Sequence, residues 1–128
     1  MNVLLDTHAL LWAVLTPDLL RRKASAIIAD ETNSIMVSAA SAWQIATKVR
    51  LGKLPGAEAP ERRFLNVMDD AEYTLSSIDA PTALRAGRLT SDHRDPLDPM
   101  IAAQPIAHDI PVISAEPQPD SFGIRPIW

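Results

Sequence analysis

Residues 2–14 read Asn-Val-Leu-Leu-Asp-Thr-His-Ala-Leu-Leu-Trp-Ala-Val. The apolar run at 2–5 has the length and composition of a short buried strand. It ends at Asp6 and Thr7, two residue types that favour helix N-caps, and an apolar segment at 8–14 follows at helical spacing. A strand that feeds directly into a helix is the basic unit of an α/β protein.

The same alternation continues along the chain. Further strands are expected at residues 35–37, 73–78, 110–114 and 123–127. Further helices are expected at 19–29, at 42–51 with Ser38 or Ser41 as cap and Gly52 at its end, around 64–68 after Pro60, at 80–89 after Asp79, and from Asp95-Pro96 onward. Pro105 predicts that this sixth helix kinks or ends near Gln104. Alternating strands and helices predict a parallel α/β sheet.

Size and composition exclude several classes of protein. With 128 residues and 47% apolar residues, the chain is expected to form one globular domain over residues 1–128. It has no cysteine, which excludes disulfides, thiolate zinc sites and a cysteine nucleophile. The apolar run at 9–15 is too short to cross a bilayer, and no basic segment precedes it as in a signal peptide. A cytoplasmic protein with no membrane partner is therefore expected.

Charge is distributed unevenly. The net charge of −4 argues against a protein coated in positive charge to bind nucleic acid, yet eleven of the twelve basic residues lie at or before Arg94. The two halves of the chain can therefore present different faces. The alternative is that these basic residues are solvated helix faces, which is the commoner origin of such runs.

Four acids are candidates for one site. Asp6 follows the first strand, Glu116 follows the strand at 110–114, and Asp95 and Asp98 lie in the first turn of the sixth helix. In open parallel sheets the carboxyl ends of strands share one edge, where ligands bind. Close carboxylates repel one another, and a hard divalent cation such as Mg²⁺ or Mn²⁺ relieves that repulsion. The alternative is that Asp6, Asp95 and Asp98 only cap helices and that Glu116 is solvated.

Other side chains carry weaker signals. The histidines do not share a metal-ligand spacing, and the four glycines form no phosphate-binding loop. Trp12, Trp43 and Trp128 are expected to pack or to border an interface.

Several motifs resemble those of the PIN-domain ribonucleases, specifically the VapC-like toxins of bacterial toxin-antitoxin pairs, over essentially the whole chain. They are Val-Leu-Leu-Asp-Thr-His-Ala-Leu-Leu-Trp at 3–12, Val-Ser-Ala-Ala-Ser-Ala-Trp-Gln-Ile-Ala-Thr-Lys at 37–48, Leu-Gly-Lys-Leu-Pro at 51–55, His-Arg-Asp-Pro-Leu-Asp at 93–98, Ile-Ala-Ala-Gln at 101–104 and Ile-Pro-Val-Ile-Ser at 110–114. The resemblance implies a three-layer α/β/α fold with a short central parallel sheet flanked by helices.

It also implies a site. In that family an acidic quartet binds Mg²⁺ or Mn²⁺ and cleaves RNA. The first acid corresponds to Asp6 and the third to Asp98, with Asp95 and Ser114 as auxiliary residues. The fourth position, commonly Asp, is Glu116 here, and the second, normally Glu, is Gln44. Two further departures are Pro99, where the family usually has Arg, and Pro105, where it has a small helical residue.

The resemblance therefore implies a Mg²⁺-dependent endoribonuclease in which Asp6, Asp98 and Glu116 hold the cation and Gln44 assists weakly. Catalysis is expected to be impaired, because an amide carries no charge and cannot act as a general base. Lys48, Arg50 and Lys53 are candidate contacts for RNA phosphates. The resemblance also implies a cognate antitoxin and a homodimer, with Leu11, Trp12 and Leu15 as candidate interface residues.

Two alternatives remain open. In the first, the chain is a catalytically inactive PIN domain that retains antitoxin or RNA binding, a hypothesis motivated by Gln44. In the second, it is an unrelated small α/β binding domain whose acids are only helix caps. A rise in melting temperature with Mn²⁺ would argue against this last interpretation.

Overall fold

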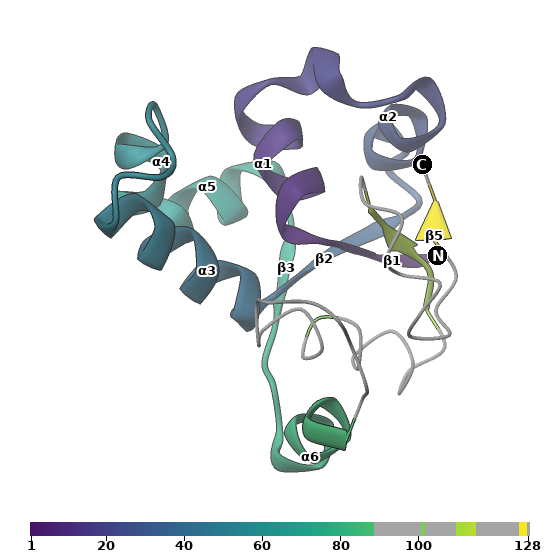
Figure 1. The fold of residues 1–128 in the computed structure, drawn as a ribbon. Coiled ribbons are helices and arrows are strands. Elements are labelled where there is room, and N and C mark those ends of the chain that lie inside the picture. The colour runs from purple at the N-terminus through teal and green to yellow at the C-terminus, as the bar shows by residue number, and fades with distance from the viewer. Residues whose placement is uncertain (89–100, 102–109, 115–125, 128) are drawn as a thin grey trace.

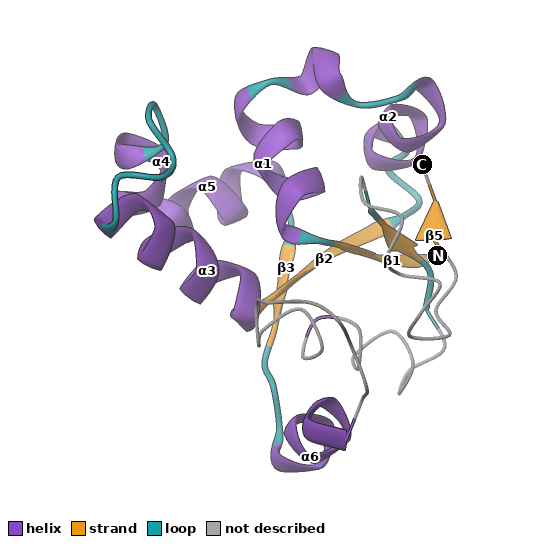
Figure 2. Cartoon of the chain, in the orientation of Figure 1, coloured by secondary structure: helices purple, strands orange, loops and turns teal. Residues whose placement is uncertain are grey.

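The computed structural model describes residues 1–88, 101, 110–114 and 126–127, which form a parallel sheet with helices around it (Figures 1 and 2). The strands are β1 (Asn2–Leu5), β2 (Ser34–Ser38), β3 (Thr74–Ser76), β4 (Val112–Ile113) and β5 (Pro126–Ile127). The helices are α1 (Thr7–Leu15), the 3₁₀ turn η1 (Pro17–Leu19), α2 (Arg22–Ala29), α3 (Ala39–Arg50), α4 (Glu58–Arg62), α5 (Phe64–Ala71) and α6 (Ala80–Arg88). The predicted alternation of strands and helices is confirmed.

The strand order is β3-β2-β1-β4-β5, and all four pairings are parallel. Strand β1 lies at the centre, with Leu4 opposite both Met36 of β2 and Val112 of β4. Two backbone hydrogen bonds of 3.0 Å join β1 to the segment that forms β4, from Leu4 N to Pro111 O and from Asp6 N to Ile113 O. Strands β2 and β3 are added on one side of β1, and β4 and β5 are added later on the other side. The strand order therefore reverses between β1 and β4. Such a switch point is where open parallel sheets bind ligands.

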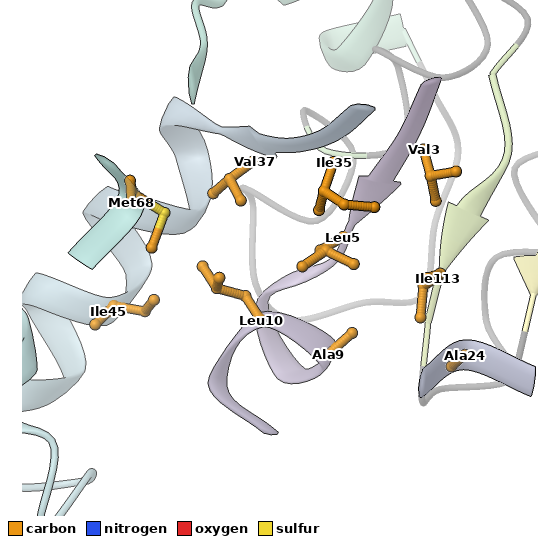
Figure 3. Packing of buried hydrophobic residues seen from close by; sticks show 10 residues of the cluster. All are labelled: Val3, Leu5, Ala9, Leu10, Ala24, Ile35, Val37, Ile45, Met68 and Ile113. Atoms are coloured by element: carbon orange, nitrogen blue, oxygen red, sulfur yellow. The ribbon is translucent and has the colours of Figure 1, made fainter. Parts of the chain in front are cut away.

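Both faces of the sheet are covered, as the three-layer expectation requires. Alternate residues of each strand point to opposite faces. Val3 and Leu5 of β1 pack in one apolar cluster with residues of β2, α1, α2, α3 and α5 (Figure 3). Leu4, between them, packs in a second cluster with Ala40, Val112 and Ile101. The continuous apolar run at 3–5 therefore reflects a strand that is buried on both sides.

Two helices begin at other residues than predicted. The expected helix at 19–29 begins only at Arg22, because Pro17–Leu19 form a 3₁₀ turn and Leu20 has extended backbone angles. The expected helix at 42–51 begins earlier, at Ala39, with Ser38 as its cap, and Ser41 lies buried inside it. The Ser38 hydroxyl accepts a 3.0 Å hydrogen bond from Ala40 N. Strand β2 therefore passes into α3 without a loop.

The expected single helix after Pro60 is two helices. Pro60 lies inside α4, and the chain breaks at Arg63, whose ψ of 26° lies outside the helical range. The apolar residues Phe64, Val67 and Met68 of α5 then pack on the first cluster. The helix predicted after Asp79 is confirmed as α6, where Asp79 Oδ1 accepts a 2.8 Å hydrogen bond from Thr82 N. The kink at Pro105 and the sixth helix lie outside the described residues.

None of the helices in the described ranges is long and apolar enough to cross a membrane.

Glu72 ends α5 in a left-handed conformation, with φ 61° and ψ 33°. Only glycine adopts this conformation without steric cost. We expect Glu72→Gly to raise the free energy of unfolding by about 0.5–1 kcal/mol, measured by urea denaturation. Ala46→Gly, at an exposed position inside α3, is the matched control and should lower it by about 1 kcal/mol. Destabilisation by both substitutions would contradict the assigned conformation.

Tyr73, the one tyrosine of the chain, packs against the first apolar cluster, and this burial raises the pKa of its phenol. A raised folded-state pKa stabilises the fold fully below the unfolded value of about 10, and the contribution is lost as the pH rises through the folded value. We expect a phenolate absorbance midpoint above 10 in the folded protein and near 10 in urea. The melting temperature should fall less steeply above pH 10 in Tyr73→Phe; equal slopes would argue against this contribution.

Candidate active site

Asp6 and Ser114 meet at the switch point of the sheet. Asp6 follows β1 directly and caps α1, where its Oδ1 accepts a 2.8 Å hydrogen bond from Ala9 N. Ser114 follows β4, and its hydroxyl donates a 2.5 Å hydrogen bond to Asp6 Oδ2. Each carboxylate oxygen of Asp6 thus accepts a hydrogen bond that orients it. A carboxylate oxygen has two acceptor sites, so a capping bond does not by itself exclude a ligand.

A second group of polar side chains lies beside it, between α1 and α3. Thr7, Ser41 and Gln44 are 6%, 0% and 2% exposed. The Thr7 hydroxyl donates to Gln44 Oε1 and lies 2.9 Å from the Ser41 hydroxyl. A hydroxyl carries one proton, so Ser41 donates to Thr7 while Thr7 donates to Gln44. Buried polar groups that are connected in this way fix the orientation of one another.

Together these five side chains form the edge group: Asp6, Thr7, Ser41, Gln44 and Ser114. These side chains converge because β1, β2 and β4 all end at the same edge of the sheet, and α1 and α3 start there. The edge group offers a carboxylate, hydroxyls and an amide oxygen. Hard divalent cations such as Mg²⁺ prefer oxygen ligands of these kinds, so this donor set fits such an ion.

Among the described residues, the acid in the edge group is Asp6. Asp95, Asp98 and Glu116, the other predicted acids, lie outside the described residues. Within the described ranges, no three acidic or histidine side chains are close enough to hold a metal ion. The structure therefore brings together Asp6, Gln44 and Ser114 of the predicted site.

The predicted RNA contacts lie farther along α3. Lys48 and Arg50 are in its last turn, and Lys53 follows Gly52, whose φ of 73° ends the helix. At 1.5 Å per residue, Arg50 is about 9 Å from Gln44 along the helix axis. These cations consequently do not belong to the edge group, although Arg50 and Lys53 are exposed.

Sequence reasoning missed Thr7 and Ser41 as partners of Gln44, because it treated both as caps. One signal was available. Ser41 precedes Gln44 by three residues, a spacing that places both on one face of a helix.

The family model for the PIN domain matches residues 3–122. The chain belongs to the PIN domain family. Within this family, residues of the chain are similar to the Ribonuclease VapC16 of Mycobacterium tuberculosis, with 64% identity over 33 residues. That match covers 26% of this chain and 23% of the relative's length.

Solved structures share the PIN fold of this chain. The crystal structure of VapBC2 from Rickettsia felis, bound to a DNA fragment from their promoter, has a TM-score of 0.70 at 12% identity and covers 99% of this chain and 98% of that chain. FitAcB from Neisseria gonorrhoeae has a TM-score of 0.63 at 16% identity and covers 98% and 96%. At these identities the likeness demonstrates the fold alone.

Proposed function

We propose that this PIN domain is a divalent-metal-dependent endoribonuclease, a VapC-like toxin of a toxin-antitoxin pair. The observation that carries the proposal is the position of Asp6. Its carboxylate lies at the switch point of a PIN sheet, with both oxygens oriented by the hydrogen bonds from Ala9 N and the Ser114 hydroxyl. The segment similar to Ribonuclease VapC16 supports the same activity.

Asp6, Asp98 and Glu116 would hold the metal, with Asp95 and Ser114 in auxiliary roles. When bound, Mg²⁺ or Mn²⁺ polarises a phosphate and lowers the pKa of a water molecule. The protein's own contribution is to fix the ligands. Ser114 orients Asp6 through its 2.5 Å hydrogen bond, and the cap to Ala9 N sets the other oxygen. Preorganised ligands bind a metal more tightly, because less conformational freedom is lost on binding.

Gln44 lowers the expected activity. It occupies the position of the family's second acid, and its oxygen accepts the hydrogen bond from Thr7. An amide can accept this bond as a carboxylate would, but it brings no negative charge to the cation and takes up no proton. This neutral, buried residue favours a second candidate function, in which the PIN domain binds an antitoxin or RNA without cleaving it.

A small apolar pocket is the proposed contact for the antitoxin. It lies among α1, α3, α4 and α5, and Leu11, Val14, Leu15 and Phe64 line it. Leu11 and Leu15 are two of the three residues that the sequence suggested for an interface. An apolar side chain from a partner helix would insert into this pocket. We further propose that the substrate is RNA and that the chain forms a homodimer. The chain would form a single domain and act in the cytoplasm.

RNA cleavage in the presence and absence of metal tests the function. The purified chain is incubated with a mixed RNA pool in Mn²⁺ or in EDTA, beside the variants Gln44→Glu, Asp98→Asn and Asp18→Asn. Asp18 is an exposed acid in η1 and serves as the charge-matched control. We expect cleavage that EDTA and Asp98→Asn abolish and Asp18→Asn preserves. Absence of cleavage even after Gln44→Glu, with no binding of Mn²⁺, would contradict the proposal.

A further inference from the structure

Helix α3 presents an exposed stripe of residues next to the edge group. Ala39, Trp43, Ala46 and Arg50 are exposed and follow one another at helical spacing. Trp43 is 58% exposed, whereas Gln44, the next residue, is 2% exposed. Within the described part of the chain, Trp43 is the single aromatic among the large exposed apolar side chains. An exposed tryptophan thus directly precedes a buried member of the edge group.

The neighbours of Trp43 on the helix are small. Positions three and four residues away on a helix are the ones that touch a side chain. For Trp43 they are Ala39, Ala40, Ala46 and Thr47. Small neighbours cover little of an indole, in agreement with the exposed fraction of Trp43. A planar ring that is anchored on a helix and more than half exposed is suited to stacking against another planar group.

Positive charge continues along the helix from Trp43. Lys48 and Arg50 lie in the last turn of α3, Lys53 follows, and Arg50 belongs to the exposed stripe itself. Aromatic side chains beside cations are the usual composition of surfaces that bind single-stranded nucleic acid, where bases stack and phosphates are neutralised. A second copy of this chain fits the stripe less well. A self-complementary contact would bury Arg50 against a stripe that holds no acid.

We propose that Trp43 stacks on a base of single-stranded RNA. Arg50 and Lys53 would contact phosphates on one side of that base, and the edge group would lie on its other side. The inference rests on the proposed ribonuclease function and adds a substrate-binding residue to it. Because stacking uses the face common to all bases, Trp43 would position the strand without selecting a sequence.

Binding of oligoribonucleotides in EDTA tests the proposal without cleavage. The probes are a fluorescently labelled oligouridylate and an abasic ribose-phosphate chain of the same length. The proteins are the intact chain and its variants Trp43→Ala, Trp43→Phe and Leu65→Ala. Leu65 is an exposed apolar residue of α5, at 66% exposure, and is the control. We expect Trp43→Ala to weaken binding of oligouridylate about tenfold, while Trp43→Phe retains most of it.

The abasic probe isolates stacking. The intact chain should bind it more weakly than oligouridylate, and Trp43→Ala should bind both probes equally. Equal binding of both probes by the intact chain, or an equal loss in Leu65→Ala, would overturn the proposal. So would a change from dimer to monomer in Trp43→Ala with the preference for bases unchanged. Cleavage of RNA by the intact chain in Mn²⁺ and in EDTA, measured separately, distinguishes a failure of the proposed ribonuclease function from a failure of this inference.

Discussion

We expect Asp6→Asn to lower Mn²⁺-dependent RNA cleavage by at least about 100-fold while the fold remains intact. The loss follows from the charge, since stabilisation by a bound cation is worth several kcal/mol and each 1.4 kcal/mol is a factor of ten in rate. The fold is preserved because asparagine caps helices about as well as aspartate. Its Oδ1 can still accept from Ala9 N, and its amide can donate to the Ser114 oxygen.

Initial cleavage rates and urea midpoints, measured on the same preparations, separate these two effects. Asp18→Asn makes the same change of net charge at an exposed site and should leave both quantities unchanged. If the cleavage rate of Asp6→Asn lies within a factor of about three of that of the intact chain, Asp6 only caps α1 and does not take part in cleavage.

The second large effect is expected from Gln44→Glu, which should raise the cleavage rate at least about tenfold. Glutamate has the same shape, so Thr7 can donate to it as it donates to the amide. The substitution adds a negative charge for the cation and a group that can take up a proton, and general bases contribute 10²–10⁴-fold. Burial disfavours the charged carboxylate. Without metal the melting temperature should therefore fall, and Mn²⁺ should raise it more than in the intact chain.

Gln44→Met is the matched control for this substitution. It keeps the side-chain volume but removes the acceptor for Thr7, which leaves a buried hydroxyl without that partner and costs about 1–3 kcal/mol. We expect lower stability and no increase in cleavage. If the intact chain and both variants cleave equally well, residue 44 has no part in the reaction, and its burial is structural.

The fold followed from the sequence where hydrophobic pattern and capping agree. Residues 3–5 are apolar without interruption because β1 is buried on both faces, and Asp6 marks the start of α1. The errors fall where the backbone turns without a strong residue signal. Leu20 and Arg63 leave the helical conformation where helices were predicted, although neither is a glycine or a proline, so the residue types at these positions gave no signal.

For the candidate site, the sequence predicted which strand ends lie together but not which side chains contact one another. The parallel sheet predicts that Asp6 and the end of the strand at 110–114 meet, because both lie at the carboxyl ends of strands, which share one edge of the sheet. The hydrogen bonds from Ser41 to Thr7 and from Thr7 to Gln44 depend on the rotation of α3 about its axis and on its position against α1. A single sequence fixes neither. The burial of Gln44 and the exposure of Trp43, one residue apart, depend on the same rotation.

Calorimetric titration of Mn²⁺ into the intact chain and into Asp6→Asn, at one pH and without RNA, tests the central claim most directly. That claim is that the Asp6 carboxylate, oriented by Ala9 N and Ser114, anchors a divalent cation. We predict saturable binding by the intact chain that Asp6→Asn weakens at least about tenfold. Equal affinity in the two proteins, or no binding by the intact chain, would contradict it.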